Sequence, residues 1–294
     1  MQRNHTGMVV LCAGVVVMVA AASGLGVFLR GSGETATIVS PRGEEYEMVT
    51  EGIYRFNSQR LVAEGIGWDL VTLFLAVPVT VAALFGLARG TLRGRLLAAG
   101  MFAYFFYQYL MYATTWAFGP LFLLFVAIYG ASLGCIAWIV STISLASLPT
   151  RFSGRFPARG IGIFSVVIAV VLVGMWLTRI VPAMQGEIDG VLLGQTTLVV
   201  QALDLGIVVP MAFFAGVLAW RRRPVGYLLA ALFVVKGVAM AAAITAMVVS
   251  AWIVEGVPQI PPLVLFAMAT LVSLWLALRI YASAGADGIG SASL

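Results

Sequence analysis

The amino-acid sequence predicts an all-α, polytopic transmembrane bundle of about eight helices that forms one membrane domain over residues 1–294. Three observations lead to this fold class. Hydrophobic residues make up 62% of the chain and charged residues only 10%, whereas soluble domains average about 25% charged residues. The apolar residues fall into runs of about 20, the length of helix that crosses a hydrocarbon core of roughly 30 Å. Arginines gather in the short loops between these runs.

The arginine-rich loops set the direction of the spans. Residues 89–95, 151–159 and 221–223 each carry three arginines and follow the second, fourth and sixth apolar segments. Basic residues favour the cytoplasmic side, so we expect a multi-pass protein of the cell membrane with both termini in the cytoplasm. The predicted spans are residues 8–29, 67–88, 96–117, 120–146, 160–182, 197–220, 225–253 and 262–282.

The first span has an alternative interpretation. Residues 1–23 combine a basic start, an apolar stretch and small residues, which is also typical of a cleaved secretory signal. The apolar run continues through residues 25–29 and favours a retained helix. Cleavage would leave seven helices and change nothing else.

One sizeable polar segment, residues 30–66, falls on the extracytoplasmic side. β-prone residues flank a Pro-Arg-Gly sequence at 41–43 and predict a small hairpin, with an irregular solvated loop as the alternative. Asn57 or Ser58 is placed to cap a helix that leads into the second span. The C-terminal residues 283–294 are small and polar, which predicts a disordered cytoplasmic tail.

The second and sixth spans resemble each other. Each contains Asp-Leu, then Val-Pro, and ends on arginine, and the spacing from Pro78 to Arg89 equals that from Pro210 to Arg221. The spacing from aspartate to proline differs between them. These features favour a parallel repeat of four helices plus four, against a chance likeness of two apolar helices that end in arginine.

Two charges lie inside apolar spans and mark the candidate site. Asp204 is about 11 Å from the outer end of the sixth span, and Lys236 in the seventh lies at a similar depth. Adjacent antiparallel helices make an Asp204–Lys236 ion pair available, and Gln201 shares the face of Asp204. Pro210 deprives the carbonyl of Gly206 of its usual donor, a combination typical of interrupted transporter helices.

Three interpretations of this pair remain open. A buried ion pair would hold two helices in register. A site for a small solute or an ion would use the charges as ligands, because an unpaired charge at the membrane centre costs at least about 2.5–3.5 kcal/mol. Lys236 could also react as a neutral amine, although a retinal Schiff base is disfavoured because the tryptophans fall at the interfaces.

Further polar residues gather in the outer half of the third span. A helical stripe includes Gln108, with Tyr107 beside it, and we count both among the candidate substrate-binding residues. The alternative is that these groups only cross-link helices. Asp69 and Arg179 fall near outer helix ends, where water is close, and are not expected to be special. Gly130 is expected to let helices approach closely, as is Gly134.

The composition also excludes several kinds of site. His5 is the only histidine, so haem ligation by paired histidines and histidine-based metal sites are excluded. Cys12 and Cys135 lie in separate apolar runs and are not expected to be partners. The net charge of +5 comes from short basic loops and does not indicate nucleic acid. We therefore expect no cofactor and no metal, and the lipid bilayer as a partner.

Two stretches resemble a known group of proteins. They are GPLFLLFVAIYGASL (119–133), and VVQALDLGIVVP (199–210) followed by RRRPVGYLLAALFVVKG (221–237). They are similar to segments of a group of bacterial and archaeal polytopic integral membrane proteins, over about Gly52 to Met240. The resemblance implies the membrane architecture and no activity.

The best functional prediction is a transporter or permease for a small solute or ion, with a mid-membrane site built on Asp204, Lys236 and Gln201. The alternative is a non-catalytic scaffold or sensor that binds a protein partner through residues 30–66. A membrane enzyme acting on lipids is less favoured, because the sequence has no aspartate-rich metal motif and no recognisable nucleophile constellation.

Overall fold

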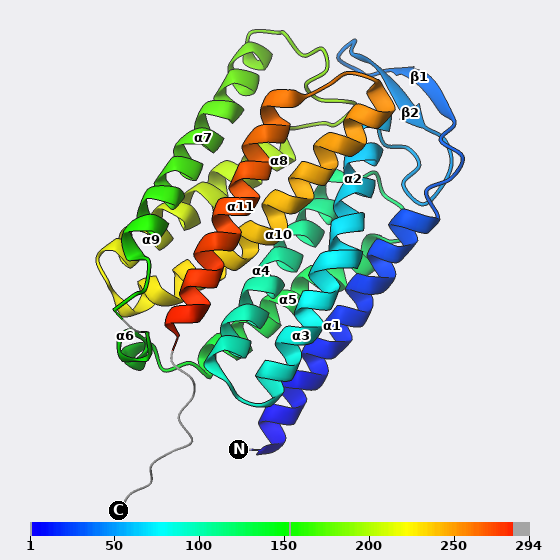
Figure 1. The fold of residues 1–294 in the computed structure, drawn as a ribbon. Coiled ribbons are helices and arrows are strands. Elements are labelled where there is room, and N and C mark those ends of the chain that lie inside the picture. Colours follow the sequence, from blue (N-terminus) through cyan, green and yellow to red (C-terminus); the bar gives the residue numbers. More distant parts are fainter. Residues whose placement is uncertain (1, 153, 285–294) are drawn as a thin grey trace, which may run out of the picture.

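The computed structural model describes residues 2–152 and 154–284 and confirms an all-α bundle with eight helical units long and apolar enough to cross a membrane. Figure 1 shows these units side by side, with a small hairpin at one end. Two of the eight units are interrupted by a π-helical turn. The units are α1 (Gln2–Phe28), α2–η1–α3 (Gln59–Val71, Thr72–Ala76, Val77–Ala88), α4 (Leu92–Thr115), α5 (Phe122–Ser141), α7 (Ala158–Met184), α8–η3–α9 (Val199–Leu203, Asp204–Val208, Val209–Trp220), α10 (Pro224–Glu255) and α11 (Ile260–Ser283).

The two ends of the bundle differ in character. One end, here called the hairpin end, carries β1 (Thr35–Val39) and β2 (Glu45–Val49), which pair antiparallel around the predicted Pro-Arg-Gly turn. The opposite end, here called the basic end, carries the three arginine-rich loops, with η2 (Leu145–Ser147) and the short helix α6 (Leu148–Arg151) in one of them. Ser58 caps α2 by accepting a hydrogen bond from the N–H of Leu61. Apart from Ser283, which ends α11, and Ala284, the predicted tail lies outside the described residues.

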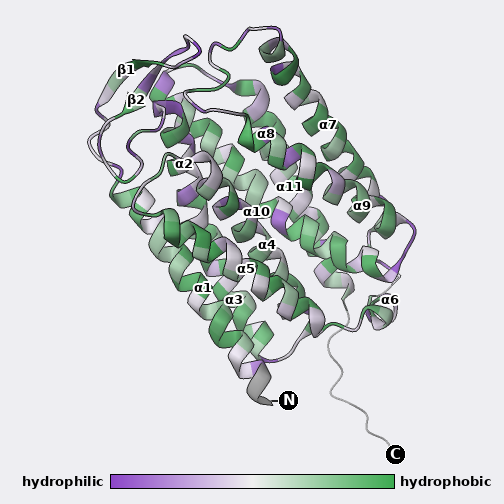
Figure 2. Cartoon of the chain, turned by 180° about the vertical axis from the view of Figure 1, so that it is seen from behind, coloured by the Kyte–Doolittle hydropathy of each residue, from purple (hydrophilic) through white to green (hydrophobic). Residues whose placement is uncertain are grey.

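The outside of the bundle is apolar along its length. Large hydrophobic side chains such as Val170, Leu271 and Phe85 are more than 60% exposed, which is unfavourable in water and ordinary against lipid. Figure 2 shows hydrophobic residues covering the helices and hydrophilic residues gathered in the end loops. The chain is therefore a multi-pass membrane protein.

The two interrupted helices have the same order of elements, and the same element lengths from the π-turn onward, when they are aligned on Pro78 and Pro210. In each, a five-residue π-turn is followed by a 12-residue helix with proline as its second residue and arginine after its last. A proline cannot donate to the carbonyl four residues earlier, and the wider π-turn absorbs this defect. In this alignment Asp204 corresponds to Thr72 and Asp69 to Gln201, which explains why the aspartate-to-proline spacings differ. The second and sixth spans are therefore alike in structure, as a parallel repeat predicts for this pair of helices.

Helices α4 and α10 lie at the centre. α10 packs against α2, α4, α9 and α11, while α4 packs against α3, α5 and α10. Helix α1 is part of the same core, with Met8, Cys12 and Val15 fully buried.

Small residues close the basic end of the second half. Gly226 of α10 lies directly against the backbone of Leu218 in α9, and Gly162 of α7 lies against the ring of Trp220. By contrast, the expectation for Gly130 and Gly134 is wrong: a Cβ at either position would meet nothing within 4 Å, because both glycines lie on the exposed face of α5.

The substitution Gly226→Ala should destabilise the bundle, because its Cβ would overlap the backbone of Leu218. Overpacking of this kind costs about 1–3 kcal/mol, so the midpoint of thermal unfolding in detergent should fall. The matched control Gly130→Ala adds the same methyl group in open space and should leave the midpoint unchanged or raise it. Equal midpoints for the two variants would contradict the close approach of α9 and α10.

Candidate functional site

A cavity of about 420 Å³ runs from the hairpin end to mid-depth in the second half of the chain. Its volume is within the roughly 300–1,000 Å³ of small-molecule pockets. Helix α7 packs chiefly on α9, and α11 on α10. The cavity lies between these two pairs, and α2 and α4 complete its wall.

The floor of the cavity is built around Asp204, the first residue of η3. The carboxylate accepts hydrogen bonds from the hydroxyl of Tyr107 in α4 and, at 2.9 Å, from Nε1–H of Trp176 in α7. Nζ of Lys236 lies 4.2 Å from the centroid of the Tyr107 ring, close enough for a cation–π interaction. Asp204, Tyr107 and Lys236 all line the cavity.

The structure does not contain the direct ion pair expected between Asp204 and Lys236. The ion pairs within 4.0 Å among the described residues are both made by Arg60, at the hairpin end. Tyr107 of α4 contacts both groups instead: its hydroxyl donates to the carboxylate and its ring faces the amine. The sequence indicated that the two charges lie near each other, but not that a residue of a third helix contacts both.

Two groups at the floor keep free hydrogen-bonding capacity. In the described part of the chain, the amine of Lys236 has no hydrogen-bond or ion-pair partner besides the ring face of Tyr107. The Gln201 side chain, one turn before Asp204 and only 6% exposed, lines the same cavity and also makes no hydrogen bond there. Buried polar groups are normally satisfied, so both groups are available to a ligand or to water.

Gln108 is not part of the cavity wall. Oε1 of its side chain lies 2.9 Å from the hydroxyl of Thr72, which lies 2.8 Å from the hydroxyl of Tyr104. Tyr107 and Gln108 are neighbours in sequence, but a helix turns about 100° per residue and directs them to different halves of the bundle. Thr72 is the counterpart of Asp204, so Gln108 belongs to the corresponding position in the first half.

The expectation that Asp69 lies near water is wrong. Asp69 is fully buried, and its carboxylate accepts hydrogen bonds from the hydroxyls of Tyr54 at 2.5 Å and Tyr112 at 3.2 Å. Three aromatic rings surround these bonds, with Tyr54 stacked on Trp116 at 4.1 Å. The first half is therefore filled with side chains where the second half is hollow.

The two cysteines are free and buried in the described part of the chain, in agreement with the expectation that they are not disulfide partners. Cys12 lies on α1 and Cys135 on α5, two helices that pack against each other.

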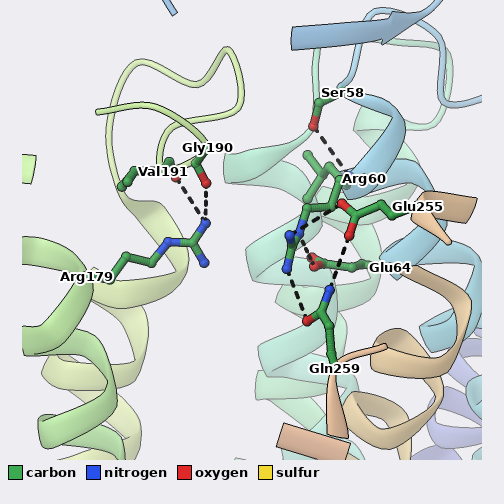
Figure 3. A network of polar contacts seen from close by, with 9 residues as sticks. Ser58, Arg60, Glu64, Arg179, Gly190, Val191, Glu255 and Gln259 are labelled. Atoms are coloured by element: carbon green, nitrogen blue, oxygen red, sulfur yellow. Dashed lines mark hydrogen bonds and ion pairs between the residues drawn. The ribbon is translucent and has the colours of Figure 1, made fainter. Parts of the chain in front are cut away.

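Charged residues ring the mouth of the cavity (Figure 3). Arg60 of α2 binds Glu64 at 3.1 Å and Glu255 of α10 at 3.3 Å, and it donates to Gln259 before α11 at 3.4 Å. Arg60 therefore ties three helices together. On the other side, Arg179 of α7 donates to the carbonyls of Gly190 and Val191 and has no carboxylate within ion-pair distance among the described residues.

The hairpin holds the loop that forms the rest of the mouth. Glu44, only 1% exposed, accepts hydrogen bonds from the N–H groups of Leu193 at 3.0 Å and Gly194 at 3.2 Å. Both residues have positive φ, 51° and 77°, and their N–H groups point to the same carboxylate. Glycine adopts this backbone conformation readily, whereas it is uncommon for a leucine. Leu193 also lines the cavity, so the hairpin is coupled to its opening.

Sequence reasoning missed Trp176 and Glu44 as members of the site. The sequence places Trp176 with the tryptophans at the interfaces, although its position in the fifth span at a depth similar to that of Asp204 is a usable signal. Nothing in the sequence marks Glu44 apart from the adjacent Glu45, because its partners are backbone groups about 150 residues away.

Comparison with known proteins does not add to this site: no family model, curated protein or solved structure matches the chain.

Replacing Glu44 with alanine should free the loop at residues 190–195. The amides of Leu193 and Gly194 would lose their acceptor, so their hydrogen exchange, measured by mass spectrometry, should accelerate at least about tenfold while exchange in α10 stays unchanged. The control is Glu45→Ala, because Glu45 is the neighbouring residue and is exposed. Unchanged exchange in Glu44→Ala would show that the contact does not hold the loop.

Proposed function

We propose that the protein is a carrier of the cell membrane, which binds a small molecule or an ion at the cavity floor and releases it on the other side. The observation that supports this most is the placement of Asp204 and Lys236 on facing helices at the closed end of an open cavity. The hairpin end is then extracytoplasmic and both termini are cytoplasmic, in line with the arginine-rich loops of the basic end.

The polar contacts favour a ligand site over a purely structural ion pair. Ionisable residues inside the membrane are costly and usually mark functional pathways. A pair that only held helices in register would gain most by direct contact, yet Asp204 and Lys236 form no ion pair within 4.0 Å and each contacts Tyr107 instead. Lys236 and Gln201 in addition keep hydrogen-bonding capacity that the protein does not use.

Between the cavity floor and the basic end, the bundle is closed by aromatic and small residues. The rings of Phe152, Phe156 and Tyr227 are in mutual contact, with centroids 4.4–5.3 Å apart. Gly162 contacts Trp220 nearby. This arrangement corresponds to a carrier that is open toward the hairpin end and closed toward the basic end.

The π-turn η3 is suited to act as a hinge between these states. It lies at the floor, and Pro210 leaves the backbone there short of one helical hydrogen bond. Movement of α9 relative to α8 would therefore break fewer bonds here than elsewhere in the span. Hinges of this kind, at the ends of elements, accompany domain closure in many proteins.

Cysteine accessibility tests whether the floor opens to both sides. Ala241 lines the cavity, and Ala212, fully buried, lies one turn beyond the lining residue Val208 toward the basic end. We expect Ala241→Cys to react with a membrane-impermeant maleimide from the hairpin side in oriented vesicles. Ala212→Cys should react from the basic side, because a carrier must also open there.

The wild type supplies the background, since Cys12 and Cys135 are buried. Asp204→Asn should change the ratio of the two reactivities several-fold, whereas Glu187→Gln, at an exposed acid outside the cavity, should not. If Ala212→Cys stays unreactive from both sides while Ala241→Cys reacts, the cavity is a dead-end pocket and the carrier proposal is wrong.

A further inference from the structure

We infer that the ligand of this cavity is a single-chain anionic amphiphile, with a carboxylate head at Lys236 and a hydrocarbon chain along the walls toward the hairpin end. This inference rests on the proposed function, because it names the substrate class of the same site. Shape, wall chemistry and the unused donors at the floor support it independently.

The lining of the cavity extends over several helical turns. It reaches from Phe233 to Val248 on α10 and from Phe164 to Arg179 on α7, and each stretch corresponds to about 22 Å of helix. A ligand with an extended hydrocarbon chain can therefore lie along these walls between the floor and the mouth.

The walls between floor and mouth are apolar. They offer methyl, methylene and aromatic groups but few hydrogen-bonding partners, so a polar solute would lose its hydration without replacement along this path. A hydrocarbon chain would instead displace water from the walls, at about 25 cal/mol for each Å² of apolar surface buried. The wall residues include Ile168, Val171, Leu172 and Met175 of α7, Ile244 and Met247 of α10, and Leu265 and Phe266 of α11.

The floor recognises a negative head. Tyr107 and Trp176 already donate to Asp204, whereas the ammonium of Lys236 has three N–H donors and no acceptor in the described part of the chain. A carboxylate at this point would accept from Lys236 and from the amide of Gln201. A cationic head would instead have to share Asp204 with Tyr107 and Trp176 and would lie beside the like charge of the Lys236 ammonium.

The mouth carries charges of both signs. Arg60 pairs with Glu64 and Glu255, and Arg179 is bound to main-chain carbonyls. These two arginines and two glutamates balance in charge, so the choice of an anionic head rests on the floor.

Lys236 allows a direct test, because it is the only lysine in the chain. The purified full-length protein in a non-ionic detergent is methylated with formaldehyde and cyanoborohydride, and modification of Lys236 is followed by mass spectrometry against the α-amino group. Oleate at micromolar concentration should slow the reaction at Lys236 at least about tenfold. Oleyl alcohol, which lacks the charge, and acetate, which lacks the chain, should each slow it less than twofold.

A pair of neighbouring substitutions separates cavity occupation from binding to the outer surface. Val171 lines the cavity, whereas its neighbour Val170 is 66% exposed and lies outside the cavity wall. Val171→Trp should abolish protection by oleate while Lys236 remains reactive, and Val170→Trp should leave protection intact.

Each outcome decides one part of the inference. Equal reactivity of Lys236 with and without oleate would overturn the substrate class, and so would equal protection by oleyl alcohol. Neither result would affect the accessibility of Ala212→Cys and Ala241→Cys, which tests the carrier proposal separately. Protection that survives Val171→Trp would place oleate outside the cavity and overturn the assignment of the site.

Discussion

A helix inside a membrane must satisfy its own backbone hydrogen bonds, and Pro210 prevents this at one point of the sixth span. Because no water is present in the hydrocarbon core to replace the lost donor, the chain widens into the π-turn η3. Asp204 begins that turn, so the same defect sets the position of the carboxylate relative to Tyr107 and Trp176. The floor of the cavity is in this sense a consequence of one missing N–H group.

The two halves of the molecule show how one architecture can serve different purposes. In the first half the interrupted helix carries Thr72 and Asp69, and tyrosines fill the space around them. In the second half the same backbone carries Asp204 and Gln201 beside a hollow. The difference follows from the packing of the fourth helix in each half. In the first half α5 packs against α1, whereas in the second half α11 packs chiefly against α10 and α7 packs chiefly against α9. The first half, which is filled with side chains, thereby supports the second half, which contains the cavity.

Much of the fold could be predicted from the sequence, because length and hydrophobicity dictate membrane spans directly. The eight spans, the hairpin at the Pro-Arg-Gly turn and the cap at Ser58 are local features, and all are present. The site was less accessible to such reasoning. Depth and helical face indicated the grouping of Asp204, Lys236 and Gln201, which line one cavity together with Tyr107. Gln108 lies outside the cavity wall, because depth does not say which side of α4 faces the cavity. The burial of Asp69 and the pairing of Glu44 with backbone amides depend on tertiary contacts that no local pattern encodes.

The position of Lys236 on the face of an aromatic ring has an electrical consequence. Aromatic contact stabilises an ammonium without cancelling its charge, so Lys236 in its protonated form carries a positive charge inside the helical bundle. A charge that crosses the whole transmembrane potential changes in energy by about 2.3 kcal/mol per 100 mV. Any rearrangement that exposes Lys236 first to one aqueous phase and then to the other moves it through part of that voltage. The balance between the two facing states would then follow the energisation of the membrane, even when no ligand is bound.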